Sequence, residues 1–205
     1  MVDGWEAPAL TQLSKAAVPW DTDALYRYLR NGHSPRHGIA GGPMAEVVRE
    51  LAQVPDADVR AMAVYLGSFN PEPVAQPQAL AQQAIDNAAR TQGQLLGPAQ
   101  RMFDSACASC HHDGDGPTLL GVNTPLALNS SLTSTRPDNL LRTILDGVRA
   151  PAHRDIGFMP AFREALDDRQ IADLAGYMRA RFAPQEAPWP NLPADVARVR
   201  ATPGH

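Results

Sequence analysis

The sequence predicts an all-α fold. Apolar residues recur every three or four positions, the spacing of one face of an α-helix, in the segments 59–66, 140–145 and 171–178. No segment shows the alternation of apolar and polar residues that is typical of a half-buried strand. The 19 prolines and 15 glycines among 205 residues separate the helical segments and predict long loops between them.

The composition excludes several classes of protein. Hydrophobic residues make up 44% of the chain, which is enough to bury a core and excludes full disorder. The net charge of −4 lacks the basic footprint of a nucleic-acid-binding protein. No apolar run reaches the length of a membrane-spanning helix. The segment Met1–Leu10 lacks the basic and apolar regions of a secretory signal.

An internal repeat relates the two halves of the chain. The segment Asp23–Gly32 resembles Asp138–Gly147, and Asp56–Phe69 resembles Asp168–Phe182. Each pair belongs to a unit in which a short helix and a glycine-rich loop precede an amphipathic helix. The repeat predicts two copies of one module. The second copy is preceded by a segment that has no counterpart in the first.

Composition shifts divide the chain into four predicted parts, which are 1–69, 70–94, 95–183 and 184–205. Prolines and a Gln/Ala-rich stretch make 70–94 a linker that becomes helical near Leu80. The proline-rich tail is expected to wrap the surface or to be loose, with one short helix over Leu192–Val199. Because a linker of this kind makes few contacts, we expect residues 1–69 to unfold independently of the second module.

The motif that carries chemistry is Cys107-Ala108-Ser109-Cys110-His111, which contains both cysteines of the chain. C-x-x-C-H is the attachment sequence of c-type haem. Positions i and i+3 of a helix share a face, so the two thiols can bond to the two vinyl groups on one side of a porphyrin. The adjacent His111 then reaches the iron as an axial ligand. The motif therefore predicts one covalent haem c.

Two other interpretations of the cysteines are open. A thioredoxin-like dithiol requires a βαβ context, which the sequence lacks. A zinc site requires four ligands, and His112 or His153 could complete a set with Cys107 and Cys110.

A second axial ligand is expected for the haem iron of an electron carrier, and a thioether favours the reduced iron. Met159 lies between two predicted helices, in Gly157-Phe158-Met159-Pro160. It is the preferred ligand, and His153 is the rival. The other methionines weighed for this role lie in predicted helices, where methionine usually fills a core, and they are Met62, Met102 and Met178.

Residues 97–182 resemble class I cytochrome c, and in particular the multi-haem cytochrome c subunits of membrane-bound periplasmic dehydrogenases for alcohol, gluconate and aldehyde or nicotinate. The segments that carry the resemblance are Phe103, Cys107–His111, Gly116–Gly121, Asn139–Gly147, Met159–Phe162 and Leu166–Phe182. The resemblance implies that Phe103 and Tyr177 lie where the first and last helices cross. It also implies that the Pro117 carbonyl accepts a hydrogen bond from the His111 ring.

Residues 3–69 resemble the later part of a preceding haem domain in the same subunits, with Met44 at the position of its iron ligand. No C-x-x-C-H precedes Met44 in this chain. We therefore expect residues 1–69 to be the C-terminal part of a cytochrome c-like domain without its haem motif, in an N-terminally truncated subunit or a haem-less remnant. Met44, His33 and His37 are then expected to be loop residues around an empty or collapsed pocket.

The resemblance implies electron transfer rather than catalysis. The chain would take electrons from the catalytic subunit of a periplasmic dehydrogenase and pass them to quinone or to a terminal oxidase. It would lie in the periplasm, where peripheral association with the membrane is left open. The alternative is a five-coordinate haem enzyme or a gas or peroxide sensor, which applies if Met159 does not bind iron.

Overall fold

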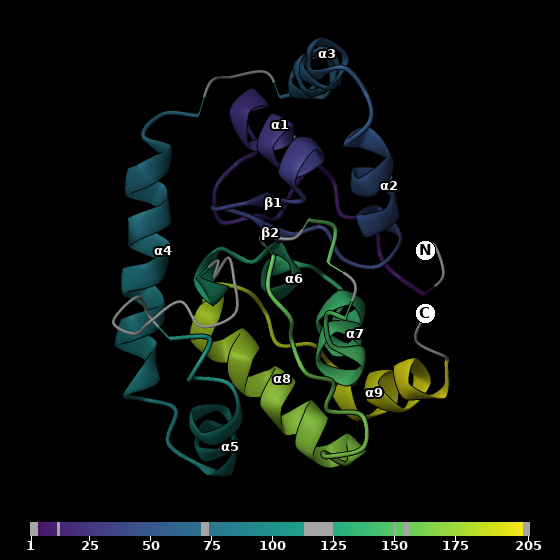
Figure 1. Ribbon diagram of the computed structural model, residues 1–205. Coiled ribbons are helices and arrows are strands. Elements are labelled where there is room, and N and C mark those ends of the chain that lie inside the picture. The colour runs from purple at the N-terminus through teal and green to yellow at the C-terminus, as the bar shows by residue number, and fades with distance from the viewer. Residues whose placement is uncertain are drawn as a thin grey trace.

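The computed structural model describes residues 4–11, 13–70, 74–112, 125–149, 151–153 and 156–202. Its fold is mostly helical, as predicted (Figure 1). The first unit consists of helices α1 (Thr22–Asn31), α2 (Pro43–Leu51) and α3 (Asp56–Gly67), with a small hairpin of β1 (His33–Ser34) and β2 (Gly38–Ile39) between α1 and α2. In the hairpin the strands are antiparallel, and His33 pairs with Ile39.

Local sequence signals set both ends of α1. The Asp21 side chain accepts a hydrogen bond from the backbone N–H of Ala24 at 2.7 Å, which satisfies one free donor of the first turn. Gly32 ends the helix at φ +71°, a conformation that favours glycine, and its N–H donates to the Tyr28 carbonyl. The buried face of α1 packs on α3 through a core that contains Leu25 and Val59.

The second unit begins with α5 (Pro98–Ala106) and continues through a 3₁₀ turn η1 (Leu126–Leu128), α6 (Ser130–Thr133), α7 (Asp138–Asp146) and α8 (Asp168–Phe182). A capping box starts α8, because Asp167 accepts from the Gln170 N–H and the Gln170 side chain accepts from the Asp167 N–H. The apolar face of α8 forms the main core of the molecule together with α5 and α7.

Helix α4 (Pro77–Gln92) lies in the segment expected to be a linker. It begins three residues before Leu80, with proline in its first turn. Ala88 is buried in the main core, and α4 contacts α8 and η1 along its length. In Figure 1 the helix runs down one side of the molecule, from the first unit to the end where α5 lies. This part of the linker is therefore a packed element of the second unit.

The proline-rich tail is packed as well. It forms helix α9 (Leu192–Ala201), with Val196 and Val199 buried. The Trp189 indole N–H donates to the Ser134 carbonyl at 3.1 Å, and the Arg179 guanidinium stacks over the Trp189 ring at 4.4 Å. These contacts hold the tail against α8, so the expectation of a loose tail is not met.

Each unit has an apolar core of its own, and a small apolar cluster and a set of polar contacts join the two units. These contacts favour coupled unfolding over the independent unfolding expected for residues 1–69. An apolar cluster joins Ala45 and Val48 of α2 to Ala152 and Ile156 of the second unit. Close by, the Ser130 N–H donates to the His37 carbonyl at 3.2 Å.

The N-terminal segment also binds to the second unit. The Glu6 N–H donates to the Asn139 side chain at 2.8 Å, and Ser134 donates to the Glu6 carboxylate at 2.6 Å. The Arg142 side chain donates to the Gly4 carbonyl at 3.0 Å. Local sequence patterns do not predict contacts between residues that lie so far apart in the chain.

His37 has its expected loop position, whereas Met44 differs because it lies in a helix. His37 lies in the hairpin turn but is buried, where its ring stacks on Trp20 with centroids 3.7 Å apart. Its ring nitrogens bond to the Val18 carbonyl at 2.9 Å and to the Ser34 hydroxyl at 2.8 Å. Met44 lies in the first turn of α2 and packs against the apolar clusters of the first unit. Both residues fill space in this unit.

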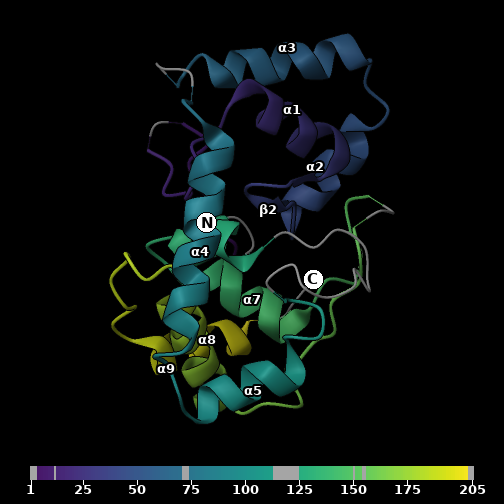
Figure 2. The ribbon, with the colours of Figure 1, turned by 90° about the vertical axis from the view of Figure 1, so that its left-hand side faces the viewer.

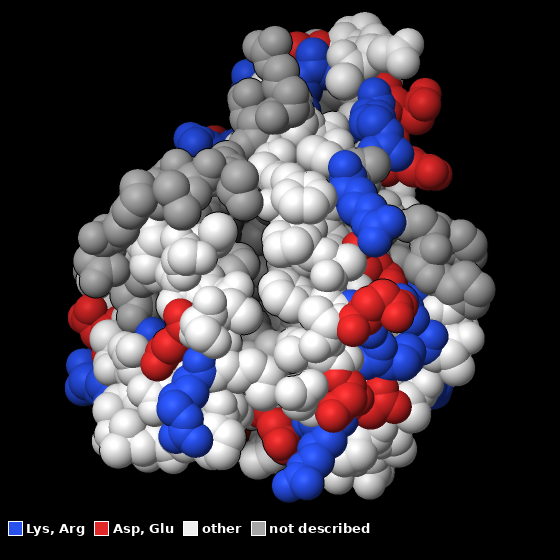
Figure 3. All heavy atoms as spheres, turned by 60° about the horizontal axis from the view of Figure 1, so that its bottom comes forward, with Lys and Arg blue, Asp and Glu red and all other residues white. Residues whose placement is uncertain are grey.

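Charged side chains of both signs lie next to one another on the face shown in Figure 3. Ion pairs in the structure include Arg163 with Asp146 at 2.5 Å and Arg200 with Asp168 at 2.5 Å. The face therefore presents no extended field of one sign. None of the described helices is long and apolar enough to cross a membrane.

The burial of His37 predicts a pH-dependent stability. Burial lowers the pKa of His37 from its usual 6.5 to about 4. The unfolded chain therefore binds a proton at this residue at a pH where the folded chain does not, and stability falls as the pH drops from 6.5 towards 4. We expect the free energy of unfolding to fall by about 2 kcal/mol between pH 7 and pH 5 because of this residue. Urea titrations followed by circular dichroism measure it.

The matched variant is His37→Gln, which keeps hydrogen-bonding capacity without a titrating ring. It should lose the His37 contribution to the pH dependence. An equal fall in the variant and the natural protein would show that His37 does not cause the effect.

The apolar cluster at the junction predicts coupled unfolding of the two units. Val48→Ala removes buried methyl groups of α2 and should cost about 2 kcal/mol. Because Val48 contributes to the cluster that joins the units, hydrogen exchange measured in native buffer should accelerate for the slowest amides of α8 as well as for those of α1. Hydrogen exchange that accelerates only in α1, α2 and α3 would show that the two units unfold independently.

Candidate haem-binding site

The candidate site begins where α5 ends. Pro98 occupies the first turn of α5, where its missing N–H costs nothing, and the side chain of Phe103 is fully buried. The Phe103 carbonyl accepts from the N–H groups of both Cys107 and Ala108, at 2.8 and 3.0 Å. This shared acceptor ends the regular helix and starts the turn that carries the motif.

The turn brings three of the expected site residues together. The Cys107 carbonyl accepts from the N–H of Cys110 at 3.1 Å and from the N–H of His111 at 2.9 Å. A turn closed in this way places positions i and i+3 on one side. Both cysteines are half-buried and form no disulfide with each other. The local geometry therefore suits the attachment of two thiols to one side of a planar group.

One atom of the His111 side chain lies in an unusual environment. The ring nitrogen Nδ1 is buried and has no hydrogen-bond partner among the described residues. A buried polar atom without a partner costs free energy, and such atoms are rare in folded proteins. Burial, with a smaller contribution from the charge of His112, lowers the pKa of His111 and favours the neutral ring. A neutral imidazole is the form that binds a metal. The donor set of two thiols and one neutral imidazole thus fits a covalent haem.

The structure does not support the two other interpretations of the cysteines. A catalytic dithiol needs a cysteine with a lowered pKa, but burial raises the pKa of Cys107 to about 11. Within the described ranges, no group of three or more His, Cys, Asp or Glu side chains is arranged to hold a metal ion. The ligand set of a zinc site is therefore not assembled from those residues.

Met159 comes from a different segment of the second unit. It forms an isolated antiparallel bridge with Val148, in which the Val148 N–H donates to the Met159 carbonyl at 2.9 Å and the Met159 N–H donates to the Val148 carbonyl at 3.1 Å. Nearby, the Phe162 N–H donates to the Ile144 carbonyl at 3.0 Å. The Met159 segment is thus fixed by backbone bonds along the end of α7.

Gly147 is a residue of this site that we did not single out from the sequence. It ends α7 at φ +71° and ψ −168°, a conformation that is almost restricted to glycine. A Cβ atom at this position would lie too close to the Met159 carbonyl oxygen for both to keep their places. The close approach of Met159 to the helix end therefore depends on glycine. The sequence contains a signal for it, since Gly147 matches Gly32 in the repeat, which also has φ +71°.

Of two further residues expected at the site, the structure describes one. Pro117, the expected acceptor for the His111 ring, lies outside the described residues. The rival ligand His153 is half-buried, and its carbonyl accepts from the Ile156 N–H at 3.0 Å.

An aromatic cluster supports the motif from the core side. The Phe103 ring lies 5.6 Å from the Tyr177 ring and 5.5 Å from the Phe182 ring, centroid to centroid. The buried Arg181 guanidinium lies 5.1 Å from the Phe103 ring and donates to the Tyr177 hydroxyl at 3.3 Å. The cluster fixes α5 on α8, where the resemblance places the crossing of the first and last helices. Truncation of a buried phenylalanine typically costs roughly 3–5 kcal/mol.

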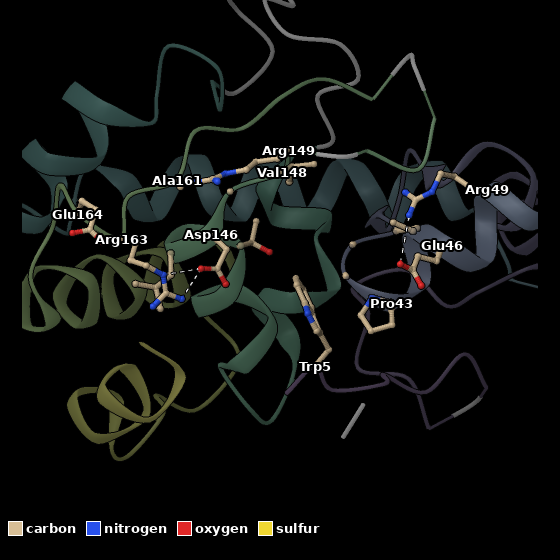
Figure 4. A pocket seen from close by; sticks show the side chains of 17 residues that line it. Trp5, Pro43, Glu46, Arg49, Asp146, Val148, Arg149, Ala161, Arg163 and Glu164 are labelled. Atoms are coloured by element: carbon tan, nitrogen blue, oxygen red, sulfur yellow. Dashed lines mark hydrogen bonds and ion pairs between the residues drawn. The ribbon is translucent and has the colours of Figure 1, made fainter. Parts of the chain in front are cut away.

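A separate cleft of about 1010 Å³ lies between the two units (Figure 4). Trp5 projects into it, with Glu46 and Arg49 of α2 on one side and Asp146 and Arg163 on the other. The cleft is lined by none of the expected haem-binding residues. It is part of the junction between the units.

The chain is similar to proteins of known name along its whole length. Residues 95–178 match the family model described as cytochrome c oxidase, cbb3-type, subunit III. Over 204 residues the chain is 49% identical to a nicotinate dehydrogenase subunit of Pseudomonas putida, covering 100% of this chain and 17% of that protein.

Two further relatives are named as cytochrome subunits. The fructose dehydrogenase cytochrome subunit of Gluconobacter japonicus is 31% identical over 228 residues, covering 98% of this chain and 44% of that protein. The cytochrome c subunit of quinone alcohol dehydrogenase from Gluconacetobacter polyoxogenes is 28% identical over 206 residues, covering 98% and 43%. The chain spans less than half the length of each of these relatives.

The motif, the helical fold and the family match define a c-type cytochrome, the class of protein that carries covalent haem c. More particularly, relatives of the chain are named as cytochrome subunits of fructose and alcohol dehydrogenases, which supports the class I cytochrome c family that the resemblance named. The names of the two cytochrome subunits among these relatives support electron transfer over catalysis. The interpretation as a haem enzyme or sensor is not favoured.

The dependence on Gly147 can be tested by Gly147→Ala. The variant puts a side chain in a conformation reserved for glycine and against the Met159 carbonyl, so the free energy of unfolding should fall by roughly 1–3 kcal/mol. The matched control is Gly93→Ala, because a Cβ at Gly93 meets nothing within 4 Å. Equal stability of the two variants in denaturant titrations would contradict the assigned role.

Proposed function

We propose that this chain accepts electrons from the catalytic subunit of a periplasmic dehydrogenase and passes them to quinone or to a terminal oxidase, through one covalent haem c. The observation that carries the proposal is the turn Cys107–His111, with both cysteines on one side and the buried Nδ1 of His111 without a partner among the described residues. The names of the relatives support the choice of a dehydrogenase as the electron donor.

Each residue of the proposed site has a separate role in holding the haem. Cys107 and Cys110 would hold the porphyrin by thioether bonds, and His111 and Met159 would ligate the iron. The Pro117 carbonyl would accept a hydrogen bond from Nδ1 of His111, which orients the ring and raises its basicity. When bound, the haem supplies the one-electron chemistry. The chain supplies the ligands and a dry, apolar core behind the motif, built on Phe103.

Residues 95–183 would form the cytochrome c domain, and residues 1–69 the haem-less later part of a second one. The repeat supports this assignment, since α1 and α3 correspond to α7 and α8. Residues 70–94 and 184–205 would then be a connection and a tail that pack on the cytochrome domain. We place the protein in the periplasm, with peripheral contact to the membrane, because c-type haem is attached outside the cytoplasmic membrane.

The proposal is tested by counting covalent haem after expression with the c-type maturation system. We expect one haem per chain, low-spin spectra in both oxidation states, and loss of covalent haem in the Cys107→Ser, Cys110→Ser double variant. Zero haem in the natural chain would overturn the proposal. A high-spin spectrum would overturn the ligation by Met159.

Met159→Ala should remove the thioether ligand and lower the reduction potential by an amount on the order of tenths of a volt. The matched control is Met102→Leu, which changes a partly buried methionine of α5 and should leave the spectrum unchanged. If His153→Ala alters the spectrum and Met159→Ala does not, then His153 is the ligand.

A further inference from the structure

Arg181 is a buried cation close to the candidate site, and the roles proposed for the site residues do not involve it. It lies in the last turn of α8 and is 2% exposed. Four positions separate it from Tyr177, so both side chains lie on one face of the helix, the face that meets α5. Figure 2 shows α5 beside α8, at the end of the molecule opposite α3.

Two other buried charges of the second unit join elements of the fold through polar groups. Asp138 pairs with Arg136 at 3.1 Å and with Arg198 of α9 at 2.7 Å. The Arg179 side chain donates to the Ser134 carbonyl at 3.1 Å. These bonds account for the burial of Asp138 and Arg179.

Arg181 instead extends into the aromatic cluster between α5 and α8. The centre of its guanidinium lies 5.1 Å from the centroid of the Phe103 ring and 4.6 Å from that of the Phe182 ring. It also donates to the Tyr177 hydroxyl at 3.3 Å. The faces of aromatic rings attract cations, and the last turn of a helix favours them as well. These contacts stabilise a positive charge inside the main apolar core.

The same cluster supports the turn that carries the cysteines. Cys107 and Ala108 pack against the core that contains Phe103, and the Phe103 carbonyl accepts from the N–H groups of both. Phe103 therefore contacts the Arg181 guanidinium through its ring and the turn through its carbonyl. A single side chain thus separates the buried cation from the start of the haem-binding motif.

We propose that the charge of Arg181 raises the reduction potential of a haem bound at Cys107–His111. Oxidised haem iron carries one more positive charge than reduced iron, so a nearby cation opposes oxidation. A charge inside the apolar core acts more strongly than an exposed one and is screened less by salt. Arginine also keeps its charge throughout the pH range in which proteins fold, so the effect is constant.

The inference rests on the proposed haem site and adds a residue of the core that determines how strongly the site holds an electron. It differs from a purely structural role in one respect. A structural residue acts through its shape and hydrogen bonds, whereas a charge acts on the iron even when the shape of the side chain changes. The reduction potential is therefore the quantity to measure.

The test is a potentiometric titration of the haem-loaded chain and of Arg181→Gln. At the potential where the natural protein is half reduced, the ratio of reduced to oxidised haem should fall about tenfold in the variant, which is a downward shift of about 59 mV. A buried unit charge has an effect of this order over roughly 10 Å at an effective dielectric constant of about 20. Arg181→Lys keeps the charge and should retain most of the potential.

Two matched controls separate the charge from its surroundings. Tyr177→Phe removes the hydroxyl that Arg181 binds but leaves the charge in place, so the potential should stay close to that of the natural protein. Arg101→Gln makes the same change of charge at an exposed position of α5. Its shift should be smaller and should disappear at high salt, whereas the shift of Arg181→Gln persists.

Arg181→Met is a second neutral variant, because an apolar side chain can often replace a buried charge without loss of stability. For each variant, the haem count and a low-spin spectrum confirm that the protein is folded and that both iron ligands are kept. An unchanged potential in the loaded neutral variants overturns the proposal. An equally large fall in Arg181→Lys or Tyr177→Phe would assign the effect to packing and also overturn it. A natural chain without haem contradicts the proposed function, so the two can fail separately.

Discussion

The contact of Phe103 with α8 is the interaction on which the rest of the structure depends. Its ring is buried between Tyr177 and Phe182, and its carbonyl accepts from two successive N–H groups of the turn that holds Cys107. The Phe103 side chain therefore belongs to the apolar core, while its main-chain carbonyl helps to form the turn of the candidate site. Because the ring cannot shift without opening the core, the position of the cysteines follows from the packing of two helices.

A second level of organisation joins the two units. The hairpin turn, the first turns of α2 and the N-terminal segment all contact the second unit, and α4 packs along α8. Several of these contacts are hydrogen bonds that involve backbone groups, such as the Glu6 N–H and the Gly4 and His37 carbonyls. The sequence repeat predicts two modules, and in the structure the two corresponding units contact each other at several places.

The sequence predicted most of the helices and a motif for the site, but not the long-range contacts. The periodicity of 140–145 and 171–178 located α7 and α8, and C-x-x-C-H located the turn after α5, because these signals are local. The hydrogen bond between Glu6 and Asn139 joins residues that are 133 positions apart, and the sequence around neither residue predicts it. The burial of His37 in its turn and the close packing of the tail were not predicted, for the same reason. Both are decided by residues that come from elsewhere in the chain.

The glycine at the end of α7 has a consequence for how the two units are connected. Gly147 lets the Met159 segment lie directly on the C-terminal end of α7. The N-terminal segment binds the same helix through Asn139 and Arg142. A change that loosens the N-terminal segment would therefore reach the Met159 segment through a single helix.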